Sequence, residues 1–443
     1  MTEKTSKNIK MGPMNGYYDK HPQTIIATCR LLGAPLPDNA ICGKPPSKYI
    51  KKGTFTGTLE NIKSVLGSNM PDIDEDELRR KFRMFKRKYK SQAILKYKSI
   101  DFTIYFCDWL LFARDRGFTH NCYFDYELYN KEWDVRDTFL NEGYRIRVHN
   151  ACSTKNYRHY LLNKAHFNKK FAKFIKRDWI DASDCEFKEF CSFVEKHESF
   201  FAKPVKGTGG AGARIINRSD GSFEELYDIC KTEELILEEI IRQHPTLEEF
   251  NDSTLNTVRV TTLLCADNVP RILLTVARFG RMGKSVDNFH GGGVGAIVDI
   301  DSGKIITEAI NMAHERSPYH PDSKKEILGF QYPEWEKVKN AVCEAALMFP
   351  EMRNIGWDVA VTYNGDVEFV EGNGRPNYDV LQSPDQVGRR DRYVPYLQEI
   401  EKMKGIYVEE LAPLNIVKYK VPLKYRVRAV LKKIKRKVRK IIK

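Results

Sequence analysis

The sequence contains no long hydrophobic run and no closely spaced cysteine pair. Its most apolar stretch, FTIYFCDWLLFA at 102–113, is short and carries Asp108, and the N-terminal segment MTEKTSKNIKMGPMNGYYDK has no apolar core. A transmembrane helix needs about 20 mostly apolar residues, so we expect neither a membrane span nor a signal peptide. The 10 cysteines lie far apart without a CxxC motif. This spacing argues against a zinc site or a compact disulfide framework and favours a reducing cytoplasm.

Acidic residues are absent from the C-terminal end, and this absence accounts for the charge of the whole chain. The 443 residues carry a formal net charge of +14, while the segment from Leu411 to Lys443 holds 13 Lys or Arg and no acid. The body is therefore nearly neutral and the tail is basic. Apolar residues recur at helical spacing in this tail: Val427, Val430, Leu431, Ile434, Val438, Ile441 and Ile442.

The amphipathic tail predicts a helix that lies on an anionic membrane surface. Each basic residue near the headgroups would contribute about 1 kcal/mol. A solvated, disordered tail is the alternative, and clustered charge alone would also attract nucleic acid. We favour the membrane surface because nucleic-acid binding does not need an apolar stripe. The expected location is the cytoplasm, with peripheral contact at the inner face of the cell membrane.

Periodicity divides the chain into a helical front and a sheet-rich remainder, which predicts an α+β protein. In DIDEDELRRKFRMFKRKYK the residues Leu78, Phe82, Phe85 and Tyr89 share one helical face, and we expect the charges to form a solvated face. The predicted parts are a mainly helical accessory region at 1–120, a helical lead-in at 121–195, a core at 196–390, a helical extension at 391–416 and the tail at 417–443.

The core contains short β-rich runs separated by glycine turns. These runs are ARIIN, LILEEII, TVRVTTLL, RILLTVARF, VGAIVDI, KIITEAI, WDVAVTY and VEFVEGN. We expect each of them to form a strand.

The segment GWDVAVTYNGDVEFVEGN at 356–373 predicts a hairpin with two opposed acids. A turn centred on Asn364-Gly365 pairs residues whose numbers sum to 729, which sets Asp358 opposite Glu371. Facing carboxylates repel each other unless a positive charge lies between them. Asn373 shares the face of Glu371 and supplies another oxygen, and oxygen-only ligands suit Mg²⁺. Alternatively, an asymmetric loop turns one carboxylate to solvent.

A glycine-rich loop lies upstream, in FAKPVKGTGGAGARIIN at 201–217. Lys203 ends a short strand-like run, ESFFAK, and glycine backbone N–H groups can approach phosphate oxygens closely. The loop is not a Walker P-loop, because no GK[ST] ends it and no helix follows it. Taken alone, a glycine-rich hairpin is more often a flexible turn than a nucleotide site. The strand LILEEII ends in Glu238 and Glu239, which face solvent or read an adenine amino group.

In order, these motifs resemble the ATP-grasp superfamily. The pattern is a lysine at a helix start, a lysine ending a strand before a Gly-rich loop, a strand running into an acidic hinge, and a terminal acid, acid-x-Asn metal site. NTVRVTTLL, VDNFHGGGVGAIVDIDSG and EGNGRPNYD look like the sugar-transfer-associated branch, which occurs with surface-polysaccharide genes. The resemblance covers about residues 120–385 and implies a lid subdomain at about 196–241 and a metal-binding subdomain at about 242–390.

The resemblance implies roles for individual residues and implies ATP and Mg²⁺ as cofactors. Lys164 and Lys203 would contact the α and β phosphates. The loop that would close over the triphosphate contains Lys206, Gly207, Thr208, Gly209 and Gly210. The adenine edge would be bound by Glu238, the Glu239 carbonyl and the Ile241 amide. Mg²⁺ would be held by Asp358, Glu371 and Asn373.

One position departs from the pattern. Many carboxylate-amine ligases of the superfamily have an arginine two residues before the first metal acid, where this chain has Gly356. Our candidate substitute is Arg278, with Asn288 as a second donor and Arg259 nearer the phosphates. Each arginine is equally explained by a surface ion pair. His290 is a substrate contact, a proton shuttle or a structural residue.

Three functions remain open. The first is an ATP-dependent carboxylate-amine ligase that forms an acylphosphate and joins an amine or amino acid to a sugar or glycan carboxylate. The second is a phosphotransferase acting on a sugar or glycan precursor, which the missing arginine favours. The third is a non-catalytic nucleotide-binding assembly factor at the membrane, against which the intact metal trio argues.

Overall fold

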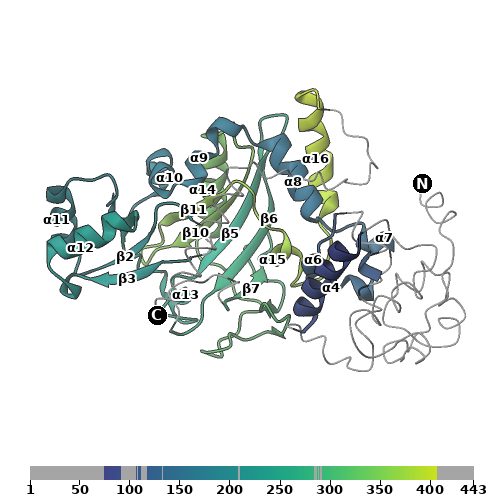
Figure 1. The fold of residues 1–443 in the computed structure, drawn as a ribbon, viewed down its shortest axis with the longest axis horizontal. Helices are drawn as coiled ribbons and strands as arrows, with labels where there is room; N and C mark the ends of the chain where they lie inside the picture. Colours follow the sequence, from purple (N-terminus) through teal and green to yellow (C-terminus); the bar gives the residue numbers. More distant parts are fainter. Residues whose placement is uncertain are drawn as a thin grey trace, which may run out of the picture.

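The computed structural model describes residues 74–90, 106, 108–110, 117–131, 133–207, 210–283, 287, 289 and 292–406. The tail predicted at 417–443 and most of the accessory region at 1–120 therefore lie outside the described residues. Within the described part, no helix combines the length and apolar character that a membrane crossing requires. The predicted α+β class is confirmed, because helices flank two antiparallel sheets (Figure 1).

The larger sheet has seven strands in the order β11-β10-β5-β6-β7-β8-β9, all paired antiparallel. The strands are β5 (Thr257–Leu264), β6 (Pro270–Phe279), β7 (Val294–Ile297), β8 (Ala309–Ile310), β9 (Arg316–Ser317), β10 (Asn354–Val361) and β11 (Val367–Asn373). Most of these match the predicted runs. KIITEAI is the exception, because only its last two residues form a strand. The Thr307 hydroxyl accepts the backbone N–H of Ile297 at 2.9 Å and so replaces a backbone pairing there.

The smaller sheet has four strands in the order β1-β4-β2-β3. They are β1 (Trp179–Asp181), β2 (Ser199–Pro204), β3 (Arg214–Asn217) and β4 (Leu235–Glu239). Strand β1 lies inside the lead-in predicted as helical at 121–195, so that prediction is corrected. Three residues, WID, are too short to show the alternation that identifies a strand, and only pairing with β4 defines it. Helices α11 (Phe187–Lys196) and α12 (Phe223–Thr232) share an apolar core with this sheet.

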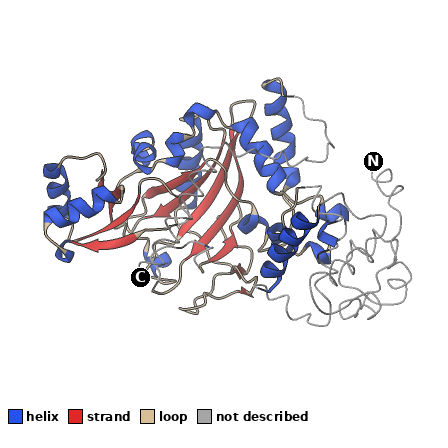
Figure 2. Ribbon diagram, in the orientation of Figure 1, coloured by secondary structure: helices blue, strands red, loops and turns tan. Residues whose placement is uncertain are grey.

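The remaining helices cover the larger sheet and the front of the chain. They are α4 (Glu75–Lys90), α6 (His120–Asp125), α7 (Trp133–Arg136), α8 (Glu142–Cys152), α9 (His159–Leu162), α10 (Lys164–Lys170), α13 (Pro245–Glu248), α14 (Trp335–Leu347), α15 (Asp379–Gln382) and α16 (Arg390–Met403). Short 3-10 turns are η6 (Leu128–Asn130), η7 (Lys155–Tyr157), η8 (Ala172–Phe174) and η9 (Arg218–Asp220). Figure 2 shows the strands of the larger sheet side by side between these helices.

The main core fills one face of the larger sheet. Trp357 is fully buried there, its ring packs edge-on against Phe171 at 5.1 Å, and Val338 and Val342 of α14 join the same cluster. A second cluster holds α8 and α16 against residues of β5 and β6. Burial of apolar side chains stabilises a fold by roughly 25 cal/mol per Å² removed from water, so α14 fixes this face as the closed one. The other face carries the polar site.

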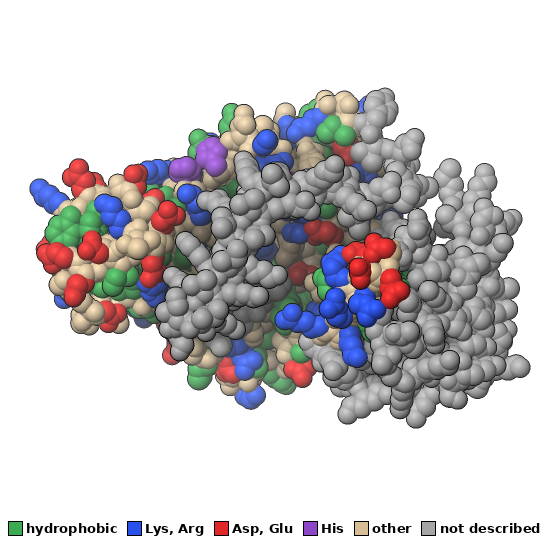
Figure 3. Space-filling model, viewed as in Figure 1, with side chains coloured by type: hydrophobic (Ala, Val, Ile, Leu, Met, Phe, Trp, Pro, Cys, Tyr) green, Lys and Arg blue, Asp and Glu red, His purple; other side chains and the backbone are tan. Residues whose placement is uncertain are grey.

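The front helices form an aromatic cluster of their own. In α4 the predicted face is confirmed for Leu78, Phe82 and Phe85, which are buried, whereas the side chain of Tyr89 lies outside the described ones. The charges of α4 pair with one another on its outer face, as with Arg79 and Glu75 at 2.9 Å, and Figure 3 shows acidic and basic side chains gathered there. This agrees with a solvated face.

A buried ion pair joins these helices. Arg136 and Asp108 are both fully buried, 2.9 Å apart, and Tyr123 donates its hydroxyl to Asp108 at 2.6 Å. We expect Asp108→Ala to destabilise the protein by about 3–5 kcal/mol, because it leaves the Arg136 charge buried without its counter-ion. Urea unfolding followed by tryptophan fluorescence measures this. Asp267→Ala, which breaks an exposed pair with Arg271, is the control and should change little. Equal effects of the two variants would refute the interpretation.

Candidate functional site

The two opposed carboxylates form the centre of the site. Asp358 of β10 pairs with Glu371 of β11, as predicted. The turn itself differs from the prediction. Thr362 and Asp366 close a three-residue loop, in which Gly365 has φ 78°. Next to this loop the residue numbers of paired residues sum to 728 instead of the predicted 729, as for Val361 and Val367. The register then shifts between Asp358 and Val359, and this bulge restores the predicted pairing at the acids.

Two arginines supply the positive charge that the pair of acids requires. Arg259 lies opposite Asp358 on β5 and binds it through Nε and Nη2, while Nη2 of Arg278 on β6 lies 3.1 Å from the same carboxylate. Burial of Asp358 works to raise its pKa, but attraction to the two guanidinium groups outweighs burial and holds the pKa below its ordinary value. Asp358 is therefore an ionised ligand that already has cationic partners.

The donor set suits a hard cation. Glu371 and Asn373 share a strand face, and the Asn373 amide donates to Glu371 at 3.0 Å, so these two side chains and Asp358 present oxygen atoms together. Only carboxylate and amide oxygens are present, which Mg²⁺ prefers. Among the described residues no group of three His, Cys, Asp or Glu side chains gathers as a metal site, so the third oxygen here comes from the Asn373 amide. The trio fits a cation that also takes phosphate oxygens and waters.

Gly356 makes room for one of these arginines. It lies two residues before Asp358 on the same strand face, and a Cβ atom there would meet Cβ of Pro376 at 2.9 Å and Cδ of Arg259 at 3.2 Å. The space that the side chain of an arginine at 356 would occupy is therefore filled by Arg259 from the neighbouring strand. Arg259 stands nearest the position of the missing residue, and Arg278 lies one strand further on.

The small sheet contributes a second charged network. Lys203 at the end of β2 pairs with Glu238 of β4 at 2.7 Å, and Arg177 bridges Glu238 at 2.9 Å and Glu368 of β11 at 2.5 Å. Burial of Glu238 opposes its ionisation, yet Arg177 and Lys203 together lower its pKa to about 2. The network ties the small sheet to the larger one, and it places Lys203 beside the cavity.

The predicted adenine-binding residues lie apart from the metal trio. The Glu238 carboxylate is engaged by Lys203 and Arg177, and Glu239 is exposed at the end of β4, where its N–H bonds to the Asp178 carbonyl at 2.8 Å. Ile241 follows in the connection after β4. Their adenine roles remain predictions.

The loop between β2 and β3 follows the predicted strand-loop-strand order. Lys164 begins α10 directly after its cap, Asn163, and its Nζ donates to the carbonyls of Pro204 at 3.0 Å and Gly207 at 3.1 Å. Burial, reinforced by the charge of Lys203, lowers the pKa of Lys164. Lys206 is exposed, and its backbone forms an isolated antiparallel β-bridge with Asn163.

Glycine is needed in this loop. Gly207, Gly210 and Gly212 all have positive φ, the region that only glycine enters freely. Thr208 and Gly209 lie outside the described residues.

One cavity of about 520 Å³ brings most of the predicted site together. Its lining includes Lys164, Lys203, Gly207, Gly210, Arg259, Arg278, Asp358, Glu371 and Asn373. Lys206, Glu238, Glu239 and Ile241 do not line it. Asn288 and His290 lie outside the described residues, so their predicted roles remain predictions.

The sequence reasoning missed Asp287. This buried acid lines the cavity, binds the backbone N–H and hydroxyl of Thr257, and lies 3.4 Å from Arg278, which it shares with Asp358. Burial raises the pKa of Asp287 despite the attraction of Arg278. The sequence did hold one signal for Asp287: it directly precedes Asn288, a predicted site residue, in VDNFHGGG.

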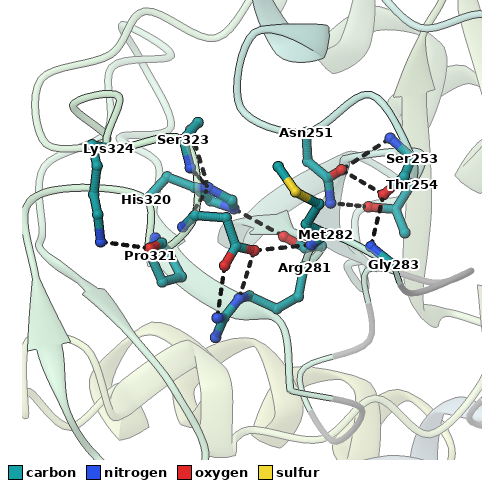
Figure 4. Close-up of polar contacts among 12 residues, drawn as sticks. Asn251, Ser253, Thr254, Arg281, Met282, Gly283, His320, Pro321, Ser323 and Lys324 are labelled. Atoms are coloured by element: carbon teal, nitrogen blue, oxygen red, sulfur yellow. Dashed lines mark hydrogen bonds and ion pairs between the residues drawn. The ribbon is translucent and has the colours of Figure 1, made fainter.

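A polar cluster anchors the segment that leads to Asp287. Arg281 forms two bonds of 2.8 Å with Asp322, and buried His320 bonds to the carbonyl of Gly280 at 2.9 Å. Figure 4 shows His320 and Ser323 beside Arg281 and Met282, with Gly283 bonded to Ser253. The chain that follows β6 is thus fastened just before Asp287.

Comparison with known proteins identifies a family. A family model described as sugar-transfer associated ATP-grasp matches residues 167–402. The ATP-grasp ligase PsnB, complexed with minimal precursor, Mg and ADP, is 13% identical, with 57% of this chain and 62% of that chain covered and a TM-score of 0.35. The D-alanine-D-alanine ligase from Coxiella burnetii is 10% identical, with coverages of 56% and 60% and a TM-score of 0.34.

A third similar structure is the D-cycloserine synthetase DcsG, at 11% identity, coverages of 57% and 73% and a TM-score of 0.35. The match spans less than two thirds of the length of several of these proteins, for example 62% and 64% of two PsnB chains. No match is found among curated proteins.

The Glu238 network predicts a pH-dependent stability. Its folded pKa of about 2 lies below the ordinary 4.5, so its contribution is complete above about 4.5 and is lost as the pH falls towards about 2. We expect Glu238→Gln to lower the urea midpoint at pH 7, and this deficit to shrink between pH 4.5 and 2.5. Exposed Glu239→Gln is the matched control. A deficit that does not change with pH would contradict the ion-pair account.

Proposed function

The chain belongs to the sugar-transfer associated ATP-grasp family, and we propose that it is an ADP-forming carboxylate-amine ligase with ATP and Mg²⁺ as its cofactors. The family match covers more than half of the chain and includes both sheets. The proposal extends this membership to a bond type and to a substrate class, namely a sugar or glycan carboxylate joined to an amine or amino acid.

The observation that carries the proposal is the composition of one cavity. The lysines Lys164 and Lys203, the opposed carboxylates of Asp358 and Glu371, and the arginines beside them, Arg259 and Arg278, all line the same space of about 520 Å³. Lysines neutralise phosphate charge, and arginines placed beside a metal site stabilise charge that develops during transfer. Such a set suits ATP-driven activation of an acid, where the protein mainly positions reactants and balances charge.

Two lysines, one loop and the metal trio then have roles towards the nucleotide. Lys164 and Lys203 bind the α and β phosphates, and the loop from Lys206 to Gly212 covers the triphosphate with backbone N–H groups. Asp358, Glu371 and Asn373 would hold Mg²⁺, which supplies neutralising charge for the phosphates when it is bound.

The arginines act on the transferred phosphoryl group. Arg259 and Arg278 share Asp358 in the structure, and Asp287 retains Arg278 when that carboxylate is taken by a cation. Their guanidinium N–H groups would then face the phosphoryl oxygens. Arg259 supplies the charge that Gly356 lacks, which supports a ligase over a phosphotransferase.

The reaction has two balanced steps. An acceptor carboxylate oxygen attacks the γ-phosphorus, the bond to the β-phosphate oxygen breaks, and ADP leaves. An amine then attacks the acylphosphate carbonyl carbon, phosphate leaves with the bonding electrons of the broken C–O bond, and the nitrogen loses a proton. The family description, sugar-transfer associated, supports a sugar as the carrier of the carboxylate.

Trapping the acylphosphate tests the proposal. Protein with Mg-ATP, D-glucuronate or D-galacturonate, and hydroxylamine should yield one hydroxamate, one ADP and one phosphate per turnover. Asp358→Asn should abolish this product, whereas Asp366→Asn, an exposed acid in the same hairpin, should not. A stable phosphorylated sugar without hydroxamate would identify a phosphotransferase instead. Absence of all turnover would favour the assembly-factor alternative.

Removing Arg259 should separate catalysis from metal binding. We expect Arg259→Met to lower turnover by about 10²–10³-fold, because a charge aimed at the transition state is lost. The Mg²⁺ concentration for half-maximal rate should fall, since Asp358 loses its competing partner. Initial rates over a Mg²⁺ titration measure both effects, and Arg259→Lys should lie between the variant and the wild type. Unchanged turnover with an unchanged Mg²⁺ requirement would refute this role.

A further inference from the structure

One wall of the cavity is a segment that crosses the polar face of the larger sheet. We call this segment, residues 374–380, the strap. Two glycines make room for it: a Cβ atom on Gly356 of β10 would meet Pro376 at 2.9 Å, and one on Gly295 of β7 would meet Val380 at 3.1 Å. The strap therefore runs from the end of β11 across to β7. It lies against the sheet because two strand positions lack side chains.

Helix α8 fastens the strap from outside the sheet. His149 bonds through Nδ1 to the carbonyl of Gly374 at 3.0 Å, Nη1 of Arg145 donates to Asn377 Oδ1 at 2.7 Å, and Nη2 of Arg375 donates to Glu142 at 2.5 Å. Glu142, Arg145 and His149 recur at spacings of three and four residues, so one face of α8 makes all three contacts. Figure 1 places α8 at the opposite end of the larger sheet from α11 and α12 of the small sheet.

The strap is distinct from the helix that braces it in its relation to the family match. Helix α8 precedes residue 167, where the match begins, whereas Arg375 and Asn377 of the strap fall inside it, as do Lys203, Asp358 and Glu371. The nucleotide part of the reaction is common to ATP-dependent ligases and the acceptor is not, so a wall of the cavity formed apart from the phosphate-binding lysines is suited to recognise the acceptor.

The charges at this end are unequally paired. Among the other cations that line the cavity, Lys203 pairs with Glu238 behind the wall, Arg259 and Arg278 share Asp358 and Asp287, and Lys164 donates to two backbone carbonyls. At the strap two guanidinium groups share one carboxylate, because Glu142 binds Arg145 at 2.6 Å and Arg375 at 2.5 Å.

Arg145 of α8 and Arg375 of the strap both line the cavity, and their side chains remain 22% and 40% exposed. Asp379, at the start of α15, is the acid that lines the other end of the strap.

We infer that Arg145 and Arg375 form an anion subsite for the acceptor, which binds a carboxylate or phosphate group of a sugar-like substrate. A guanidinium group offers parallel N–H donors that match either anion. Asn377 lies beside Arg145 and adds an amide. The inference rests on the proposed function, since it assigns the acceptor of the same cavity. It also fixes the substrate class as an anionic sugar rather than a neutral one.

Calorimetric titration of the full chain tests the subsite. The protein is first saturated with Mg²⁺ and the non-hydrolysable analogue AMP-PNP, which occupies the phosphate-binding lysines. D-Glucuronate, D-glucose 1-phosphate and neutral D-glucose are then titrated separately. We expect at least one anionic sugar to bind and glucose not to bind, and the anion that binds identifies the carboxylate or the phosphate as the recognised group.

Variants locate the binding. Arg375→Gln and Arg145→Gln should each raise the Kd of that anion by about tenfold or more, because each removes a charge-assisted hydrogen bond. The Kd of AMP-PNP should stay within about twofold of the wild type. Arg271→Gln, an arginine of similar exposure that pairs with Asp267 outside the cavity, should leave both values unchanged.

Two results would overturn the subsite. The first is an anion affinity equal to the wild type in both Arg145→Gln and Arg375→Gln, and the second is no binding of either anionic sugar to the wild type. Failure of the proposed function appears in a different experiment, the hydroxamate assay, in which no hydroxamate forms. If AMP-PNP itself does not bind the wild type, the anionic sugars are titrated without nucleotide. The same two outcomes then decide the subsite independently of the nucleotide site.

Discussion

The repulsion between Asp358 and Glu371 is the constraint on which the rest of the site depends. Antiparallel pairing forces the two carboxylates together, so the neighbouring strands must supply cations. Arg259 and Arg278 do so from β5 and β6, in sequence 99 and 80 residues before Asp358. Because both guanidinium groups and a metal ion would bind the same carboxylate, the resting protein holds its arginines where Mg-ATP would release them. The contacts of Arg259 and Arg278 with Asp358 would thus do two things: they neutralise the buried carboxylate when no cofactor is bound, and they keep the guanidinium charges close to where the reaction would use them.

The glycines of the larger sheet follow from the same crowding. Arg259 needs space beside Asp358, and the strap needs a flat surface, so Gly356 serves both. An arginine at position 356, as in many related ligases, would displace Pro376 and the stem of Arg259. The chain therefore carries its charge on β5 instead of β10. In our proposal, what looks in the sequence like a missing catalytic residue is a different placement of the same charge.

Much of this site was predictable from short-range patterns, and the rest was not, for physical reasons. The hairpin register at Asp358 was correct, although the turn was not, because a three-residue loop and a bulge shift the pairing in opposite directions. Strands with clear alternation, such as β5, were found at their observed ends, while β1 was missed because only its partner defines it. Asp287 and Arg375 were missed because their functions depend on contacts with Arg278 and Glu142. No local periodicity encodes such contacts.

The two ends of the cavity differ in how they hold charge, and this difference assigns them separate tasks. At the end proposed for the nucleotide, the buried network of Arg177, Glu238 and Lys203 links the two sheets, because Arg177 also binds Glu368 of β11. At the strap end Arg145 and Arg375 are partly exposed, and Arg375 is held by Glu142 of α8, a helix that packs with α16 in a separate apolar cluster. A wall braced by a helix suits an acceptor that enters a preformed pocket. In our proposal the acceptor pocket is therefore the braced part of the site, and its charge pattern is the feature that should distinguish one anionic sugar from another.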